Sequence, residues 1–318
     1  MIGSLINYNV SVCVFYALVS GSMNFVMKNL FVNHEWKYIS VILLLQMILT
    51  ISFLDGLRLL NIVKFTSYTF SIGKEIMFPA VLYCANVGFS LMSLSYVSIP
   101  VYGVIKRLTP GACAIISYIV LKKTEKSMIG ISIVMLCIGT VLTGVGDLKF
   151  DLGAYGLGIG SVISQALYLV YIQQKGIKYD VLTMMYANSV NCIPILATFA
   201  YFSGETMAAF ENEETFSLSL WIDLGVLLFA GIVLNYALFL CTTVNSALAT
   251  TVTGVCKALV TTVLGFFTFG GQPLTATLLG GIAINTIGSI VYSYAKYVEK
   301  RDRETAKYVE IVDQSEQG

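Results

Sequence analysis

Charged residues are scarce in this sequence. Asp, Glu, Lys and Arg make up 12% of its 318 residues and hydrophobic residues make up 57%, whereas roughly a quarter of a soluble domain is charged. The shortage runs along the whole chain, and no basic patch lies outside the loops, so nothing suggests a nucleic-acid partner. The composition predicts an all-α protein that crosses a lipid bilayer many times.

Histidine clusters and paired cysteines are also lacking. The single histidine, His34, lies in a predicted loop, which excludes a metal site built from several histidines. The seven cysteines are scattered through apolar segments without a CxxC motif, so we interpret them as small buried hydrophobic residues. The chain shows no nucleophile elbow, no paired carboxylates at membrane depth and no phosphate-binding glycine loop after a strand. It therefore predicts neither an enzyme nor a bound cofactor.

Long apolar runs are what the chain has in abundance. A bilayer core about 30 Å thick needs about 20 helical residues to cross it, and ten segments satisfy this length. They span about 9–31, 38–60, 75–96, 98–121, 127–146, 153–173, 181–202, 220–242, 246–269 and 274–297. We expect a single transmembrane domain over residues 1–318, whose last part, 298–318, is a polar tail.

Lysine and arginine gather in alternate short loops, after the second, fourth and sixth segments, and in the tail 298–318. The loops between them are poor in cations, and one of them, 203–217, is acidic. Cytoplasmic loops of membrane proteins carry the excess of Lys and Arg. Both termini are therefore predicted to face the cytosol.

One short sequence motif occurs twice. The stretch VYGVIKRL at 101–108 and the stretch VTGVCKAL at 252–259 are identical at five of eight positions. The two copies lie five predicted helices apart, and an odd offset makes the two helices run in opposite directions. This pattern is typical of an inverted repeat, with one five-helix half over about 9–146 and the other over about 153–297.

Each copy of this motif carries a lysine well inside the membrane, Lys106 in the first and Lys257 in the second. A cation at that depth costs at least ~2.5–3.5 kcal/mol on insertion scales and usually faces a wet cavity or a partner. The segments that hold these lysines contain no acid at similar depth, so we expect the anion to come from outside the chain. Two lysines approaching from opposed halves suit adjacent phosphate groups.

The acids nearest to membrane depth have other expected partners. Asp55 and Glu75 lie near helix ends beside Arg58 and Lys74, where ion pairing or snorkelling suffices to explain them. Arg107 points about 100° away from Lys106 on a helix. It either contributes to the anion site or binds a helix end.

Uncharged polar residues at membrane depth complete the candidate site. Tyr102 lies one helical turn before Lys106, on the same face. Amides can read the edges of a nucleobase, and tyrosine can stack on a ring. The alternative for all of these residues is ordinary hydrogen bonding between helices. The candidates are Tyr102, Asn86, Tyr186, Asn188, Thr253 and Gly254.

These residues lie in stretches that resemble the nucleotide-sugar transporters of the drug/metabolite transporter superfamily, over roughly residues 10 to 300. The most telling are VSIPVYGVIKRLTP, GVGDLKFDLGAYGLG, CTTVNSALATTVTGVCKALVTTVLGFF and NTIGSIVYSYAKYVEKR. The likeness is to the branch that carries UDP-glucuronate, UDP-N-acetylgalactosamine and related UDP-sugars. It implies ten helices, exchange of a nucleotide sugar for a nucleoside monophosphate in Golgi or ER membranes, and phosphate-binding roles for Lys106 and Lys257.

The relatives that carry GDP-mannose have a Phe-Tyr-Asn-Asn stretch and a Gly-Ala-Leu-Asn-Lys stretch. This chain instead has Ala187 between Tyr186 and Asn188, and Cys256 before Lys257. The two lost amides argue against guanine and fit a UDP carrier, without identifying the sugar.

The expected function is therefore an alternating-access antiporter that exchanges a UDP-sugar (UDP-glucose, UDP-glucuronate or UDP-N-acetylhexosamine) for UMP, as a monomer or a homodimer. Two alternatives stay open. One is a carrier of another phosphorylated anion. The other is a membrane adaptor that keeps the transporter fold and acts in trafficking or granule maturation.

Overall fold

The computed structural model describes residues 2–96, 102, 105–122, 127–145 and 152–257, and parts of 276–302. All regular structure in these ranges is helical. Five of the helices are long and apolar enough to cross a membrane. The helices are α1 (Ile2–Asn33), α2 (Ile39–Leu59), α3 (Phe70–Tyr96), α5 (Thr109–Leu121), α6 (Ser127–Val145), α7 (Leu152–Lys175), α8 (Val181–Phe202), α9 (Glu205–Glu211), the 3-10 helix η1 (Glu213–Phe216) and α10 (Leu218–Val244).

Most of these boundaries follow the expected segments. Helix α1 begins seven residues earlier than expected and α3 five residues earlier, and the acidic loop 203–217 folds into α9 and η1. Residues 247–257 and the described residues between 276 and 302 are also helical. The rest of the expected segments 246–269 and 274–297 lies outside the described residues, so the count of ten helices stays a prediction.

The expected continuous helix 98–121 is wrong, because the chain turns at Arg107 and Leu108 before α5 begins at Thr109. The cause is Pro110, in the first turn of α5. Proline lacks the N–H that would bond to the carbonyl four residues earlier, which is that of Lys106. The Thr109 hydroxyl donates to this carbonyl instead, at 2.6 Å. A lysine expected inside a helix therefore lies at a helix break.

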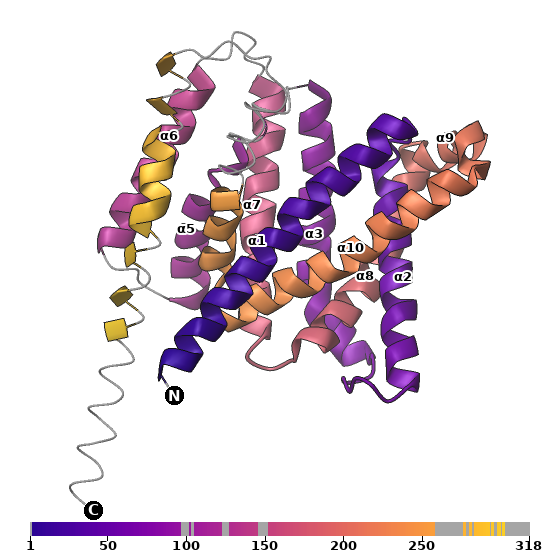
Figure 1. The fold of residues 1–318 in the computed structure, drawn as a ribbon, viewed down its shortest axis with the longest axis horizontal. Helices are drawn as coiled ribbons and strands as arrows, with labels where there is room; N and C mark the ends of the chain where they lie inside the picture. The colour runs from indigo at the N-terminus through magenta and orange to yellow at the C-terminus, as the bar shows by residue number, and fades with distance from the viewer. Residues whose placement is uncertain are drawn as a thin grey trace, which may run out of the picture.

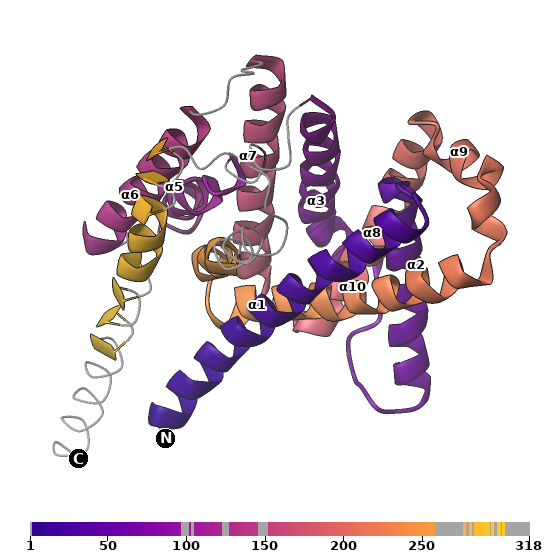
Figure 2. The same ribbon diagram turned by 45° about the horizontal axis from the view of Figure 1, so that its top comes forward.

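The helices pack mainly in pairs (Figure 1). Helix α3 lies along α7, α1 lies along α10, and α2 lies along α8. Helices α1 and α10 run obliquely across the more upright α3 and α7, and Figure 2 shows the same crossing after the molecule is turned. Each of these pairs therefore joins a helix from residues 2–96 to a helix from residues 152–244.

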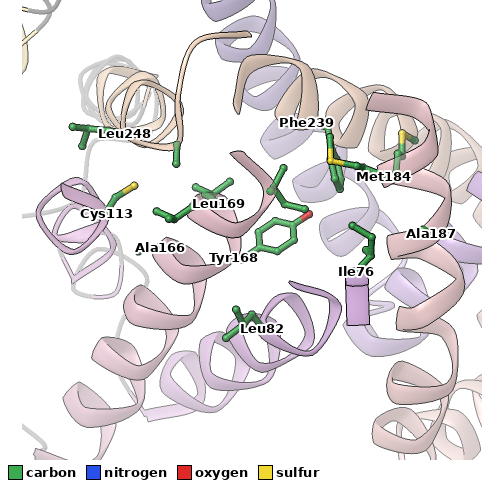
Figure 3. Packing of buried hydrophobic residues seen from close by; sticks show 14 of the residues in the cluster. Ile76, Leu82, Cys113, Ala166, Tyr168, Leu169, Met184, Ala187, Phe239 and Leu248 are labelled. Atoms are coloured by element: carbon green, nitrogen blue, oxygen red, sulfur yellow. The ribbon is translucent and has the colours of Figure 1, made fainter. Parts of the chain in front are cut away.

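The core between these helices is apolar. Figure 3 shows Cys113 of α5 and Leu248 on one side of Ala166 and Leu169 of α7, and all four are buried. Many large hydrophobic side chains on the opposite faces are exposed. Exposed apolar faces on long apolar helices are what a lipid-facing surface requires. The protein is a multi-pass membrane protein.

Helix α6 packs closely against the C-terminal helical residues, which lie beside it in Figure 1. The Asn285 side chain donates to the Leu136 carbonyl and to the Thr140 hydroxyl, both at 3.1 Å. A Cβ at Gly139 would lie 2.8 Å from the backbone nitrogen of Asn285. Backbone atoms cannot move aside cheaply, so glycine sets this helix spacing.

We expect Gly139→Val to destabilise the folded protein, because overpacking of this kind typically costs about 1–3 kcal/mol. The measurement is thermal unfolding of the protein purified in detergent. Gly130→Val on the same helix is the control, since a Cβ there meets no atom within 4 Å. Equal melting temperatures for the two variants would show that the close approach is unimportant.

At the C-terminal end of α1, His34 connects this helix to η1 and α10. The His34 ring lies between two carboxylates, with Nδ1 3.0 Å from Glu214 and Nε2 3.2 Å from Asp223. Nearby, the Trp36 indole N–H donates to the Thr215 hydroxyl at 3.0 Å. The hydrogen bond to Glu214 contributes most to raising the pKa of His34 above its ordinary value, and burial opposes it.

A histidine with a raised pKa in the folded state stabilises that state fully below its ordinary pKa near 6.5. The stabilisation is lost as the pH rises through the raised value. We therefore expect the melting temperature to fall as the pH rises above about 6.5, and His34→Gln to remove most of that fall. Glu35→Gln, at the neighbouring position, is the control and should leave the pH dependence unchanged. An undiminished fall in His34→Gln would contradict the assignment.

Candidate functional site

The lysine at the helix break is held by uncharged side chains. The ammonium group of Lys106 donates to the amide oxygen of Asn86 on α3 at 2.6 Å and to that of Gln165 on α7 at 2.9 Å. It also lies 5.6 Å from the centre of the Tyr102 ring, within the range of a cation–π contact. Two candidate site residues, Asn86 and Tyr102, are thus brought together around Lys106.

A second layer of hydroxyl groups orients Tyr102. Its hydroxyl donates to Ser90 on α3 at 2.5 Å and lies 3.3 Å from the Ser161 hydroxyl on α7. A Cβ at Gly158 would lie 3.0 Å from the Ile105 side chain. The glycine lets α7 approach the segment that carries Lys106.

The second lysine is held by α1. The ammonium group of Lys257 donates to the Ser20 hydroxyl at 2.6 Å and contacts the Ser20 carbonyl at 3.3 Å. The Thr253 hydroxyl, one turn earlier, donates to the carbonyl of Ala249 within its own helix at 2.8 Å. Gly254 has open space where a side chain would be.

Within the described ranges, neither Lys106 nor Lys257 lies within ion-pair distance of a carboxylate. Both are partly buried, and their partners are neutral oxygen atoms. Burial of an unpaired cation is expensive. The arrangement therefore leaves two positive charges that an anion would stabilise.

The acids near membrane depth are engaged elsewhere. Glu75 lies 3.0 Å from Lys175 and also binds Lys178, so among the described residues its ion-pair partners are these two lysines and not the adjacent Lys74. The α7–α8 connection reaches back to α3 and supplies closer cations. Asp55 accepts a hydrogen bond from the Tyr186 hydroxyl at 3.1 Å.

Helix α8 places its candidates in two different surroundings. The Tyr186 ring packs on Phe65 at 5.2 Å between centroids, on the α2 side of the molecule. Asn188 is buried, and its amide oxygen has no hydrogen-bond partner in the part of the chain that is described. A buried acceptor without a donor is costly, so Asn188 is the residue of α8 that a ligand would most readily satisfy.

Comparison with known proteins decides the family. The chain is 34% identical to UDP-galactose/UDP-glucose transporter 7 of Arabidopsis thaliana over 294 residues, which cover 90% of this chain and 89% of the relative. The chain belongs to the nucleotide-sugar transporter family. It is also 30% identical to the UDP-N-acetylglucosamine transporter UGNT1 of the same plant, over 84% of this chain and 81% of that one. No protein-family model matches it.

The fold agrees with a solved structure. A crystal structure whose sequence is 12% identical superposes with a TM-score of 0.66, covering 92% of this chain and 99% of the other. At that identity the likeness concerns the fold alone. The relatives are named as transporters, so this nucleotide-sugar transporter is not an enzyme, and the expected family is confirmed.

The transporter places its predicted site residues in three groups. Lys106, Asn86 and Tyr102 form one group with α7, and Arg107 is buried beside it at the helix break. Lys257, with Thr253 and Gly254, forms a second group with α1, and Tyr186 belongs to a third with α2. Residues next to Lys257 pack in the same core cluster as Ala166, a neighbour of Gln165.

Gln165 and Ser20 of this transporter were not among the site residues predicted from its sequence. A glutamine in the middle of an apolar helix, away from the other two glutamines at the end of α7, was a signal that could have pointed to Gln165. Serine is too common in membrane helices to single out Ser20. Both residues gain their meaning from a lysine far away in the sequence.

An apolar groove of about 830 Å³ lies between α5, α6 and α7 of the transporter. Ile115, Tyr118, Ile138 and Ile163 are among its lining residues, and neither lysine is. Its surface suits hydrocarbon rather than a phosphate, so the groove is not the candidate site.

Proposed function

We propose that this transporter is an antiporter that carries a UDP-sugar from the cytosol into the lumen of the Golgi, the ER or a secretory vesicle and returns UMP. The observation that carries the proposal is the pair of partly buried ammonium groups, those of Lys106 and Lys257, which are held only by neutral oxygen atoms among the described residues. A diphosphate supplies the missing negative charge. Phosphate oxygens also accept several hydrogen bonds from ammonium groups.

The helix break adds to the positive potential near Lys106. The first turn of a helix has N–H groups without intrahelical partners and carries a partial positive charge. Helix α5 begins at Thr109, three residues after Lys106. Broken helices whose N-termini face anionic groups occur in other transporters. We assign Arg107, buried at the same break, a supporting role toward the same phosphates.

The packing supports two five-helix halves of opposite orientation, about 9–146 and 153–297. In such a repeat α1 corresponds to α7, and α3 corresponds to α10. The close pairing of α3 with α7 is then matched by that of α10 with α1. Each lysine also bonds to the first helix of the other half, Lys106 to α7 and Lys257 to α1. Rocking of one half against the other would open the site to each side in turn.

The remaining candidates are assigned to the nucleoside and the sugar. Asn188 offers an unsatisfied amide oxygen, and Tyr186 and Tyr102 offer rings and hydroxyls. Asn86 acts through Lys106, while Thr253 and Gly254 leave space beside Lys257. The names of the relatives favour UDP-glucose, UDP-galactose or UDP-N-acetylhexosamine as cargo, and UDP-glucuronate belongs in the same panel. Both termini and the tail 298–318 are placed in the cytosol by the distribution of Lys and Arg.

Counterflow in proteoliposomes loaded with UMP tests this function. We expect wild type to take up a UDP-sugar, and Lys106→Ala and Lys257→Ala each to lower uptake at least about tenfold, because loss of one buried charge-assisted hydrogen bond of ~1.5–3 kcal/mol has that effect. Lys64→Ala, at an exposed loop lysine, is the control and should behave as wild type. Undiminished exchange in Lys257→Ala would contradict the proposed site.

Competition in the same assay and a rescue experiment in cells separate the other two functions. Competition by sugar phosphates but not by UMP would indicate a carrier of another phosphorylated anion. Rescue of a cellular defect by the double variant Lys106→Ala, Lys257→Ala would indicate an adaptor that needs no transport.

A further inference from the structure

The acceptors that hold the two lysines share two properties. They are uncharged, and in each case one comes from the first helix of the other half: Gln165 on α7 holds Lys106, and Ser20 on α1 holds Lys257. The two bonds therefore cross the boundary at which the proposed halves would move. Neither Gln165 nor Ser20 belongs to the candidate residues that the sequence suggested.

The geometry around Lys106 is the more informative of the two. A lysine ammonium has three N–H donors, and Asn86 and Gln165 occupy two of them at 2.6 Å and 2.9 Å. Two fixed acceptors on different helices determine where the third N–H points. Because both acceptors are amides, they satisfy the donors without cancelling the charge.

A carboxylate in the position of Gln165 would have the opposite effect. It would accept the same hydrogen bond and also neutralise Lys106, so that an incoming phosphate would compete with a covalently tethered anion. A neutral amide can be displaced at a smaller free-energy cost. The loss of a hydrogen bond to a charged group costs about half or less of the free energy that is lost when a buried ion pair is broken.

We infer that Gln165, together with Ser20, is a positioning residue that holds a substrate-binding lysine across the two halves until the substrate's phosphate replaces it. The two residues act as neutral placeholders: Gln165 keeps Lys106 aimed and charged, and Ser20 does the same for Lys257. Arrival of the phosphate transfers the ammonium groups from these holders to the cargo. That exchange removes two bonds that tie the halves together, and so it links cargo binding to the freedom of the halves to move. This inference rests on the proposed function.

The test is the single change Gln165→Glu in the full chain. We expect it to weaken UDP-sugar binding by tenfold or more at neutral pH, measured by isothermal titration or by thermal stabilisation with UDP-glucose and UDP-N-acetylglucosamine. Gln165→Met, which removes the acceptor but adds no charge, should weaken binding only severalfold. Lowering the pH should partly restore binding in Gln165→Glu alone, because protonation of the introduced carboxyl frees Lys106.

Gln173→Glu is the matched control, because it makes the same change two turns further along α7. The side-chain oxygen of Gln173 accepts from the backbone N–H of Ala247 at 2.9 Å, and a carboxylate can do the same. Binding should stay near the wild-type value. In the Lys106→Met background, Gln165→Glu should cause no further loss of binding, since the effect needs the lysine.

The outcomes separate this inference from the function on which it rests. If wild type neither binds nor exchanges any UDP-sugar, both are overturned. If wild type exchanges UDP-sugars and Lys106→Ala abolishes this, but Gln165→Glu binds as tightly as wild type, only the placeholder role is overturned. Equal losses in Gln165→Glu and Gln165→Met would likewise overturn it, because shape rather than charge would then explain both.

Discussion

An ammonium group inside a bilayer is tolerated only while its N–H groups have acceptors, and the nature of those acceptors decides what else it can bind. Carboxylates would make Lys106 and Lys257 inert structural pairs. The amide oxygens of Asn86 and Gln165 and the hydroxyl of Ser20 satisfy the donors and leave the charge. The other features of the site are arranged around this constraint, since three helices must supply those oxygens at the right depth.

The helix break at Arg107 and Leu108, before Pro110, also helps to place Lys106. A continuous helix would engage the Lys106 carbonyl in its own hydrogen-bond ladder and place the side chain wherever the helical face happened to point. The missing proline N–H interrupts the ladder, and the Thr109 hydroxyl satisfies the freed carbonyl. The N-terminus of α5 then lies next to the lysine. One proline thus combines a local break with a local positive potential.

The ends of the helix pairs are tied by charged groups that lie away from the lysines. Glu75 joins α3 to Lys175 and Lys178 near the start of α8, and His34 joins the end of α1 to Glu214 and Asp223. Both ties connect the first part of the chain to the second. These acids are therefore paired with other residues and do not neutralise Lys106 or Lys257.

The sequence by itself determined the membrane class and most helix boundaries and singled out Lys106 and Lys257 as candidates, because hydrophobic length and misplaced charge are local properties that need no partner to be recognised. It also suggested Asn86 and Tyr102. It missed the break at Arg107, since the apolar run 98–121 outweighed one proline. Only the tertiary structure decided that Glu75 pairs with Lys175 and Lys178, and that Gln165 and Ser20 hold the lysines. These contacts join residues 59 to 237 positions apart, and the packing of α7 and α1 against other helices, rather than any local pattern, brings them within reach.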